Sequence, residues 1–154
     1  MEFTIIPKLS FDDKQSLLKW WLLLLVVFVV HNLEEILFDM YAWEMTHRLP
    51  VWMEASRTFH TSIKLTSSRF LVIVLVLCIV VSGLAFILRD RPRASKTWMT
   101  VFVVIMLGIF LGHLVTSLYA RSPQPGVYSA VLQGMPVYGF VLYQLWRAPA
   151  QEDT

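Results

Sequence analysis

The chain has 154 residues, of which 56% are hydrophobic and only 16% charged, with a net charge of +2 and a mean hydropathy of +0.61. Soluble proteins carry about 25% charged residues, and a chain of this size cannot bury so much apolar surface in one water-soluble core. The small net charge and the scattered basic residues argue against a nucleic-acid partner. We therefore predict an all-α integral membrane protein that forms a single domain over residues 1–154.

Four apolar runs are long enough to cross a hydrocarbon layer about 30 Å thick. They predict transmembrane helices over residues 17–38, 70–88, 98–119 and 127–146. Arg89, Arg91 and Arg93 make the connection between the second and third helices basic, which predicts a cytoplasmic loop and cytoplasmic N and C termini. The longer loop, residues 40–68, repeats apolar residues at helical spacing after Pro50. We expect it to form one or two short helices at the outer interface.

Two further features bear on how the helices pack. Gly108 and Gly112 have the i, i+4 spacing of small residues that lets two membrane helices approach closely. Pro136 predicts a kink in the fourth helix, because proline cannot donate a hydrogen bond to the carbonyl of Leu132.

A polar motif, His31-Asn32-Leu33-Glu34-Glu35, lies inside the first predicted span. Its histidine and glutamates share one helix face. The apolar stretch before the motif, residues 17–30, would be only ~21 Å long, too short to cross. Two carboxylates near mid-bilayer cost roughly 5–7 kcal/mol, whereas the leucines and valines before them return about 3–5 kcal/mol. Protons, a cation or groups from other helices must therefore neutralise Glu34 and Glu35.

The other predicted spans offer partners at the same depth. With a cytoplasmic N terminus, His31, His113 and Gln133 all lie ~10 Å below the outer ends of their helices. Thr116 and Ser117 share the helix face of His113. This agreement in depth predicts one polar site between the helices.

Two imidazoles with one or two carboxylates suit a divalent transition metal, with zinc favoured and iron possible. We predict His31, Glu34, Glu35 and His113 as ligands, with His60 reaching in from the outer loop, and Thr116, Ser117 and Gln133 around them. Glu34 and Glu35 are also the candidates for a catalytic general acid or base.

Three functions remain open at this point. The first is a metal-dependent enzyme in the membrane that acts on a lipid or another apolar small molecule. The second is a carrier of protons or metal ions, in which the two glutamates exchange protons. The third is an accessory membrane subunit whose polar core is a structural hydrogen-bond network. The cytoplasmic half of the predicted bundle contains few polar residues, which favours one-sided access and hence the enzyme over the carrier.

The chain also resembles the family of integral membrane proteins named for their HXXEE motif. His31 to Glu35 fit that motif, and Gly112-His113, Pro125-Gly126, Pro136 and Tyr143-Gln144-Leu145 fit later positions of the family pattern in order and spacing. The resemblance covers about residues 26–147 and marks His31, Glu34, Glu35 and His113 as motif positions, with Pro125-Gly126 as a structural one. It implies a protein of a prokaryotic plasma membrane and supplies no reaction, and His60 has no counterpart in the pattern.

Overall fold

The computed structural model describes residues 14–147, and the predicted cytoplasmic termini lie outside this range. The described residues are all helical apart from short connections. The elements are α1 (Lys14–Leu37), α2 (Met40–Thr46), α3 (Val51–Ser62), α4 (Ser67–Ile87), η1 (Leu88–Asp90), α5 (Pro92–Ala120), α6 (Val127–Ser129), η2 (Ala130–Gly134) and α7 (Met135–Arg147). The expected all-α class is confirmed, with no strand between residues 14 and 147.

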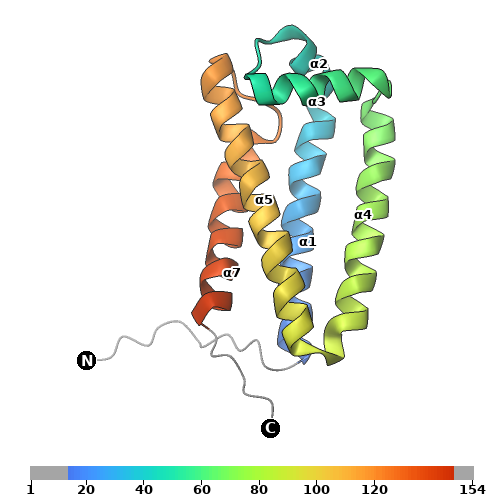
Figure 1. Ribbon diagram of the computed structural model, residues 1–154, viewed down its shortest axis with the longest axis vertical. Helices are drawn as coiled ribbons and strands as arrows, with labels where there is room; N and C mark the ends of the chain where they lie inside the picture. Colours follow the sequence, from blue (N-terminus) through green and yellow to red (C-terminus); the bar gives the residue numbers. More distant parts are fainter. Residues whose placement is uncertain (1–13, 148–154) are drawn as a thin grey trace, which may run out of the picture.

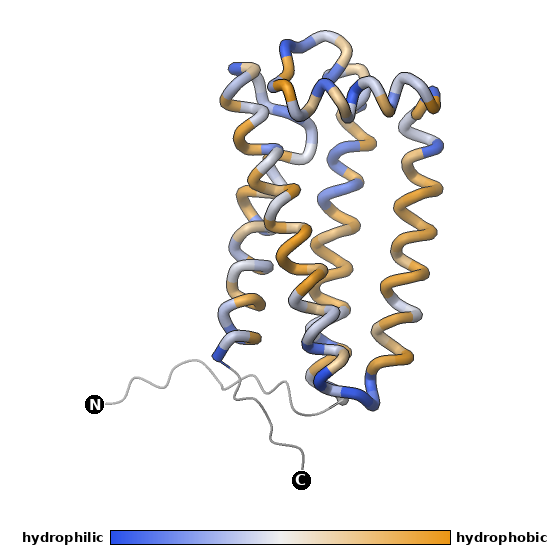
Figure 2. Tube along the Cα trace, viewed as in Figure 1, coloured by the Kyte–Doolittle hydropathy of each residue, from blue (hydrophilic) through white to orange (hydrophobic). Residues whose placement is uncertain are grey.

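Within residues 14–147, three helices are long and apolar enough to cross a membrane: Gln15–Leu37, Ser67–Asp90 and Pro92–Ala120. They correspond to the first three predicted spans and fit a membrane protein. Figure 2 shows α4 as apolar along most of its length, and most of its side chains are exposed, which suits contact with lipid. The fourth predicted span is not among these helices, because a π-helical turn divides it and its longest α-helical part, α7, has 13 residues.

The segment from 127 to 147 runs beside α5 and α1, so these helices form a bundle (Figure 1). Its irregular turn, η2, ends two residues before Pro136, where the sequence predicted a kink. In a regular α-helix the proline ring clashes with the carbonyl four residues earlier, and a wider turn relieves that clash. Gly134 ends this turn, and a Cβ on it would lie 2.7 Å from the ring of Phe110. The last helical segment and α5 therefore approach each other closely at Gly134.

The predicted packing role of Gly108 and Gly112 is wrong. Nothing lies within 4 Å of a Cβ added to either residue. The physical reason is that α4 packs mainly against α1, so no second helix of the described part of the chain covers this face of α5.

The connection between α1 and α4 forms two short helices, where the sequence predicted one or two. Asp39 caps α2 by accepting a hydrogen bond from the amide of Ala42, and Pro50 precedes the first residue of α3. Figure 1 shows α3 lying across one end of the bundle, which we call the α3 end; the opposite end holds η1.

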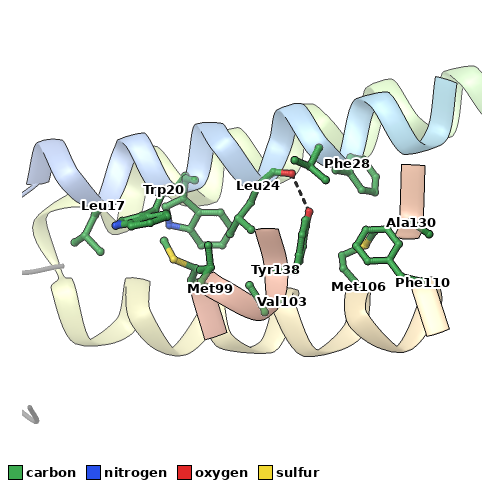
Figure 3. Close-up of a cluster of buried hydrophobic side chains, with 14 of the residues drawn as sticks. Leu17, Trp20, Leu24, Phe28, Met99, Val103, Met106, Phe110, Ala130 and Tyr138 are labelled. Atoms are coloured by element: carbon green, nitrogen blue, oxygen red, sulfur yellow. Dashed lines mark hydrogen bonds between the residues drawn. The ribbon is translucent and has the colours of Figure 1, made fainter. Parts of the chain in front are cut away.

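An apolar core fills the bundle from the η1 end to about its middle (Figure 3). Leu17, Trp21 and Leu24 of α1 meet Met99 and Val103 of α5, and all five are buried. Two buried polar groups inside the bundle are paired: the Trp21 indole donates to Ser95, and the Tyr138 hydroxyl donates to the carbonyl of Leu24. The polar motif lies above this core, toward the α3 end.

Candidate metal centre

His31 and Glu35 of α1 meet His113 of α5, and all three side chains are buried. Glu35 Oε1 lies 3.7 Å from His31 Nε2 and 3.0 Å from His113 Nε2. One ligand atom from each residue lies within 4.8 Å of the others. Ligands held tetrahedrally at 2.0–2.2 Å from a zinc ion stand ~3.3–3.6 Å apart. The three side chains could therefore hold a divalent metal after small shifts.

A hydrogen-bond chain sets the tautomer of His31. The Ser129 hydroxyl donates to the carbonyl of Gly126, at 3.1 Å, so its oxygen is left to accept from His31 Nδ1, also at 3.1 Å. The proton of a neutral His31 is thereby assigned to Nδ1. The lone pair of Nε2 then faces Glu35, and this nitrogen has no hydrogen-bond partner among the described residues. An imidazole fixed in this way is oriented as a metal ligand.

The turn at Pro125-Gly126 forms one wall of this group. Gly126 has a φ of +92°, a conformation that glycine adopts without strain. A Cβ on it would lie 2.8 Å from His31 Cε1, 3.0 Å from Glu35 Cγ and 3.0 Å from His113 Cε1. The glycine therefore lets the chain turn directly against all three candidate ligands.

Glu34 does not join the group, although the sequence counted it as a ligand and as a catalytic candidate. Its two carboxylate oxygens accept the backbone N–H groups of Tyr128, at 3.2 Å, and Ser129, at 2.7 Å. These are amides of the first turn of α6, which has no side-chain cap of its own. Glu34 therefore caps the start of the last helical segment from a neighbouring helix.

The three residues that the sequence placed around the ligands, Thr116, Ser117 and Gln133, also differ in their positions. Ser117 donates to the carbonyl of His113 and accepts from the amide of Gln124, so it fixes the start of the Pro125-Gly126 turn. Thr116 is fully buried, and its hydroxyl has no partner among the described residues. Gln133 lies in η2 and is not among the residues that line the cavity at the candidate centre.

This cavity has a volume of about 500 Å³ and extends from the three candidate ligands to the inner side of α3. His60 lines it, but its Nδ1 bonds Glu44 Oε2 at 2.9 Å, and it is not part of the three-residue group. Tyr41 packs edge-on against the His60 ring. The sequence did not identify Glu44, Gln124 and Ser129 as site residues. Among these three, only Ser129 could have been found, because it lies four residues before Gln133 and therefore shares its helix face.

Burial raises the pKa of Glu44 above its usual 4.5, against the opposing effects of the hydrogen bond and charge of His60. Because the pKa of this carboxyl is higher in the folded than in the unfolded state, its protonation adds to the free energy of unfolding. This contribution is fully present below pH 4.5, the unfolded-state pKa, and is lost as the pH rises through the folded-state pKa. The amide that Glu44→Gln introduces stays neutral throughout this range. We expect the unfolding midpoint of this variant in detergent, relative to the native chain, to rise as the pH increases from about 4.5 to about 8. Parallel pH curves for the two proteins would contradict this assignment.

Comparison with known proteins places the chain among relatives whose activity is not named. A family model described as a protein of unknown function with HXXEE motif matches residues 21–141. The chain is 24% identical over 119 residues to the uncharacterized protein YrkK of Bacillus subtilis (strain 168), covering 76% of this chain and 68% of that protein. No solved structure matches. Because the family model spans most of the chain, including the motif, His113 and the Pro-Gly turn, this protein belongs to the HXXEE-motif family.

Proposed function

We propose that the protein is a membrane-embedded metalloenzyme in which His31, Glu35 and His113 hold one divalent transition ion. The observation that carries the proposal is the convergence of these three buried side chains from two apolar helices, beside an open cavity. Two histidines and one carboxylate with a free coordination position are a common catalytic zinc set and also suit non-haem iron.

The bound ion would activate water or polarise a substrate oxygen. The protein supplies a buried setting, an imidazole oriented by Ser129, and a cavity that reaches the membrane-spanning part of the bundle. These features suit a lipid or another apolar small molecule as substrate. Glu34 is left out of the ligand set because both of its oxygens are used by backbone amides, and His60 because it pairs with Glu44.

The carrier hypothesis finds less support. A carrier needs a polar route to both faces of the membrane, but below the candidate centre the bundle is filled by the apolar core of Figure 3. The polar groups that the core contains, such as Tyr138 and Trp21, are paired with protein atoms.

Metal binding is the first test. Purified protein titrated with Co²⁺ should bind about one equivalent and show the absorption of a low-coordinate site. His113→Ala should weaken binding by more than the ~10–100-fold that loss of an outer hydrogen-bond partner costs, because it removes a ligand. His60→Ala is the matched control and should bind as the native chain does. Equal binding by the native chain and His113→Ala would reject the site and favour the structural polar core of an accessory subunit.

We also propose that the α3 end faces outward, that the segment from 127 to 147 is a fourth crossing, and that both termini are cytoplasmic. The basic residues around η1 support this orientation. In a Cys78→Ser background, a cysteine at exposed position 91 should react only from the cytoplasm, and one at exposed position 121 only from outside. Labelling of both positions from the same side would remove the third crossing, and the reverse pattern would invert the orientation. A cysteine at exposed position 147 should also react only from the cytoplasm, and its labelling from outside would remove the fourth crossing.

A further inference from the structure

The cavity beside the candidate centre has two chemically different parts. Near α3 its lining holds the polar groups of Glu35, His113, Gln124 and His60, together with apolar side chains of α2, α3 and the first turn of α4. Toward the middle of the bundle its lining is apolar and comes from α1, α4 and α5: Phe28, Leu77, Met106 and Ile109. Such a division suits a ligand with one polar and one apolar end.

The apolar part is open between α4 and α5. Gly108 and Gly112 of α5 line the cavity, and nothing lies within 4 Å of a Cβ added to either. Since α4 packs mainly against α1, no side chain from a neighbouring helix closes this gap at the glycines. In a chain that spans a membrane, this side of the cavity faces hydrocarbon.

The depth of the cavity matches one leaflet. At 1.5 Å per residue, Leu77 lies ~15 Å from Ser67 at the start of α4, and Gly108 ~18 Å from Ala120 at the end of α5. Half of a hydrocarbon layer about 30 Å thick is ~15 Å. The cavity thus extends from the interfacial helix α3 to about the middle of the bilayer, the depth that one alkyl chain of that leaflet occupies.

The charges of the residues that line the cavity restrict which head group the ligand can carry. Among the described residues that line the cavity there is no Lys or Arg, whereas sites for phosphate groups characteristically use Arg or Lys. The imidazoles, the amide of Gln124 and the hydroxyl of Tyr41 suit an uncharged oxygen group.

We propose that the cavity binds a single-chain lipid with an uncharged oxygen head, such as an alcohol, carbonyl or ester, which enters sideways from the membrane between α4 and α5. The head lies beside Glu35, His113 and Gln124, and the alkyl chain lies along Leu77, Gly108 and Ile109. This inference names the substrate class for the proposed enzyme and rests on that function for its catalytic meaning. Binding of the lipid itself needs no metal.

The test is photocrosslinking with hexadecanol that carries a mid-chain diazirine, on the full chain in nanodiscs and with the metal removed by a chelator. We expect crosslinks on α4 near Leu77 and on α5 near Ile109. Gly108→Leu should reduce them by at least ~10-fold, because the new side chain occupies the opening. Leucine at this helical position improves helix propensity, and the empty surroundings of the glycine leave room for it.

Gly83→Leu is the matched control: Gly83 is also a helical glycine with nothing within 4 Å, and it does not line the cavity. Its crosslinking should equal that of the native chain. The proposal is overturned by unchanged labelling of Gly108→Leu, by a phospholipid with a mid-chain diazirine that labels the same residues as strongly as the alcohol does, or by crosslinks confined to the apolar groove of Trp20, Leu23 and Phe140 between α1 and α7.

Metal binding by the same preparations separates the two proposals. If Co²⁺ binds and the alcohol does not, the lipid proposal fails alone. If the alcohol binds at the expected residues and Co²⁺ does not, the metalloenzyme fails and the lipid site stands.

Discussion

Gly126→Ala should abolish metal binding and lower the free energy of unfolding by at least ~2 kcal/mol. An alanine held at the φ of +92° costs about 1–2 kcal/mol in backbone strain alone. Its methyl group would also press on His31, Glu35 and His113, at 2.8–3.0 Å. Either the turn moves away and releases the cap on α6, or the three side chains separate. Both outcomes disrupt the ligand group.

Chemical unfolding in mixed micelles and Co²⁺ titration measure the two effects. Gly139→Ala is the control, because nothing lies within 4 Å of its added Cβ and it lies in the regular helix α7. It should be neutral or stabilising by about 0.5–1 kcal/mol. A Gly126→Ala protein with native metal affinity would show that the turn does not shape the site.

Glu34→Ala should destabilise the metal-free protein by about 1–3 kcal/mol, which is the cost of leaving a buried backbone group without a partner, because the partly buried amide of Ser129 loses its acceptor. The amide of Tyr128 loses its acceptor as well, but this bond is exposed and adds little. The neighbour of Glu34 supplies the comparison. Glu35→Gln removes a candidate ligand without freeing any backbone amide, so it should lose metal affinity at a smaller loss of stability.

The pair of variants therefore separates the two glutamates of the motif, one by stability and the other by metal affinity. Unfolding with a chelator present isolates the stability effect, and Co²⁺ titration of the folded fraction isolates the affinity. If Glu34→Ala folds as stably as the native chain but fails to bind metal, Glu34 is a ligand and its capping role is rejected.

The sequence predicted the helices well where length and hydropathy decide the outcome. α1, α4 and α5 follow from long, predominantly apolar runs, of which the first is long enough only with the polar motif included, and Pro50 marked the start of α3. The depth comparison also brought His31 and His113 together correctly, because the rise per residue of a helix is nearly constant.

The division of labour within the motif could not be predicted. Glu34 and Glu35 are adjacent, so helical spacing places both near His31, and only the position of the last helical segment decides which one meets backbone amides. The same holds for Gly108 and Gly112, whose spacing permits helix packing but does not supply the helix. Gln124 lines the cavity, and Glu44 bonds the cavity residue His60. Both are brought there by the fold of two connections, which leaves no periodic signal in the sequence.

X-ray absorption at the metal edge tests the central claim most directly. Protein purified from metal-replete cells should carry close to one zinc or iron ion, with two imidazole nitrogens and a carboxylate oxygen at ~2.0–2.2 Å. The His113→Ala protein, loaded at high metal concentration, should lose one imidazole from this shell. A shell that is unchanged by His113→Ala, or native protein that is stable and free of metal, would contradict a metal centre at His31, Glu35 and His113.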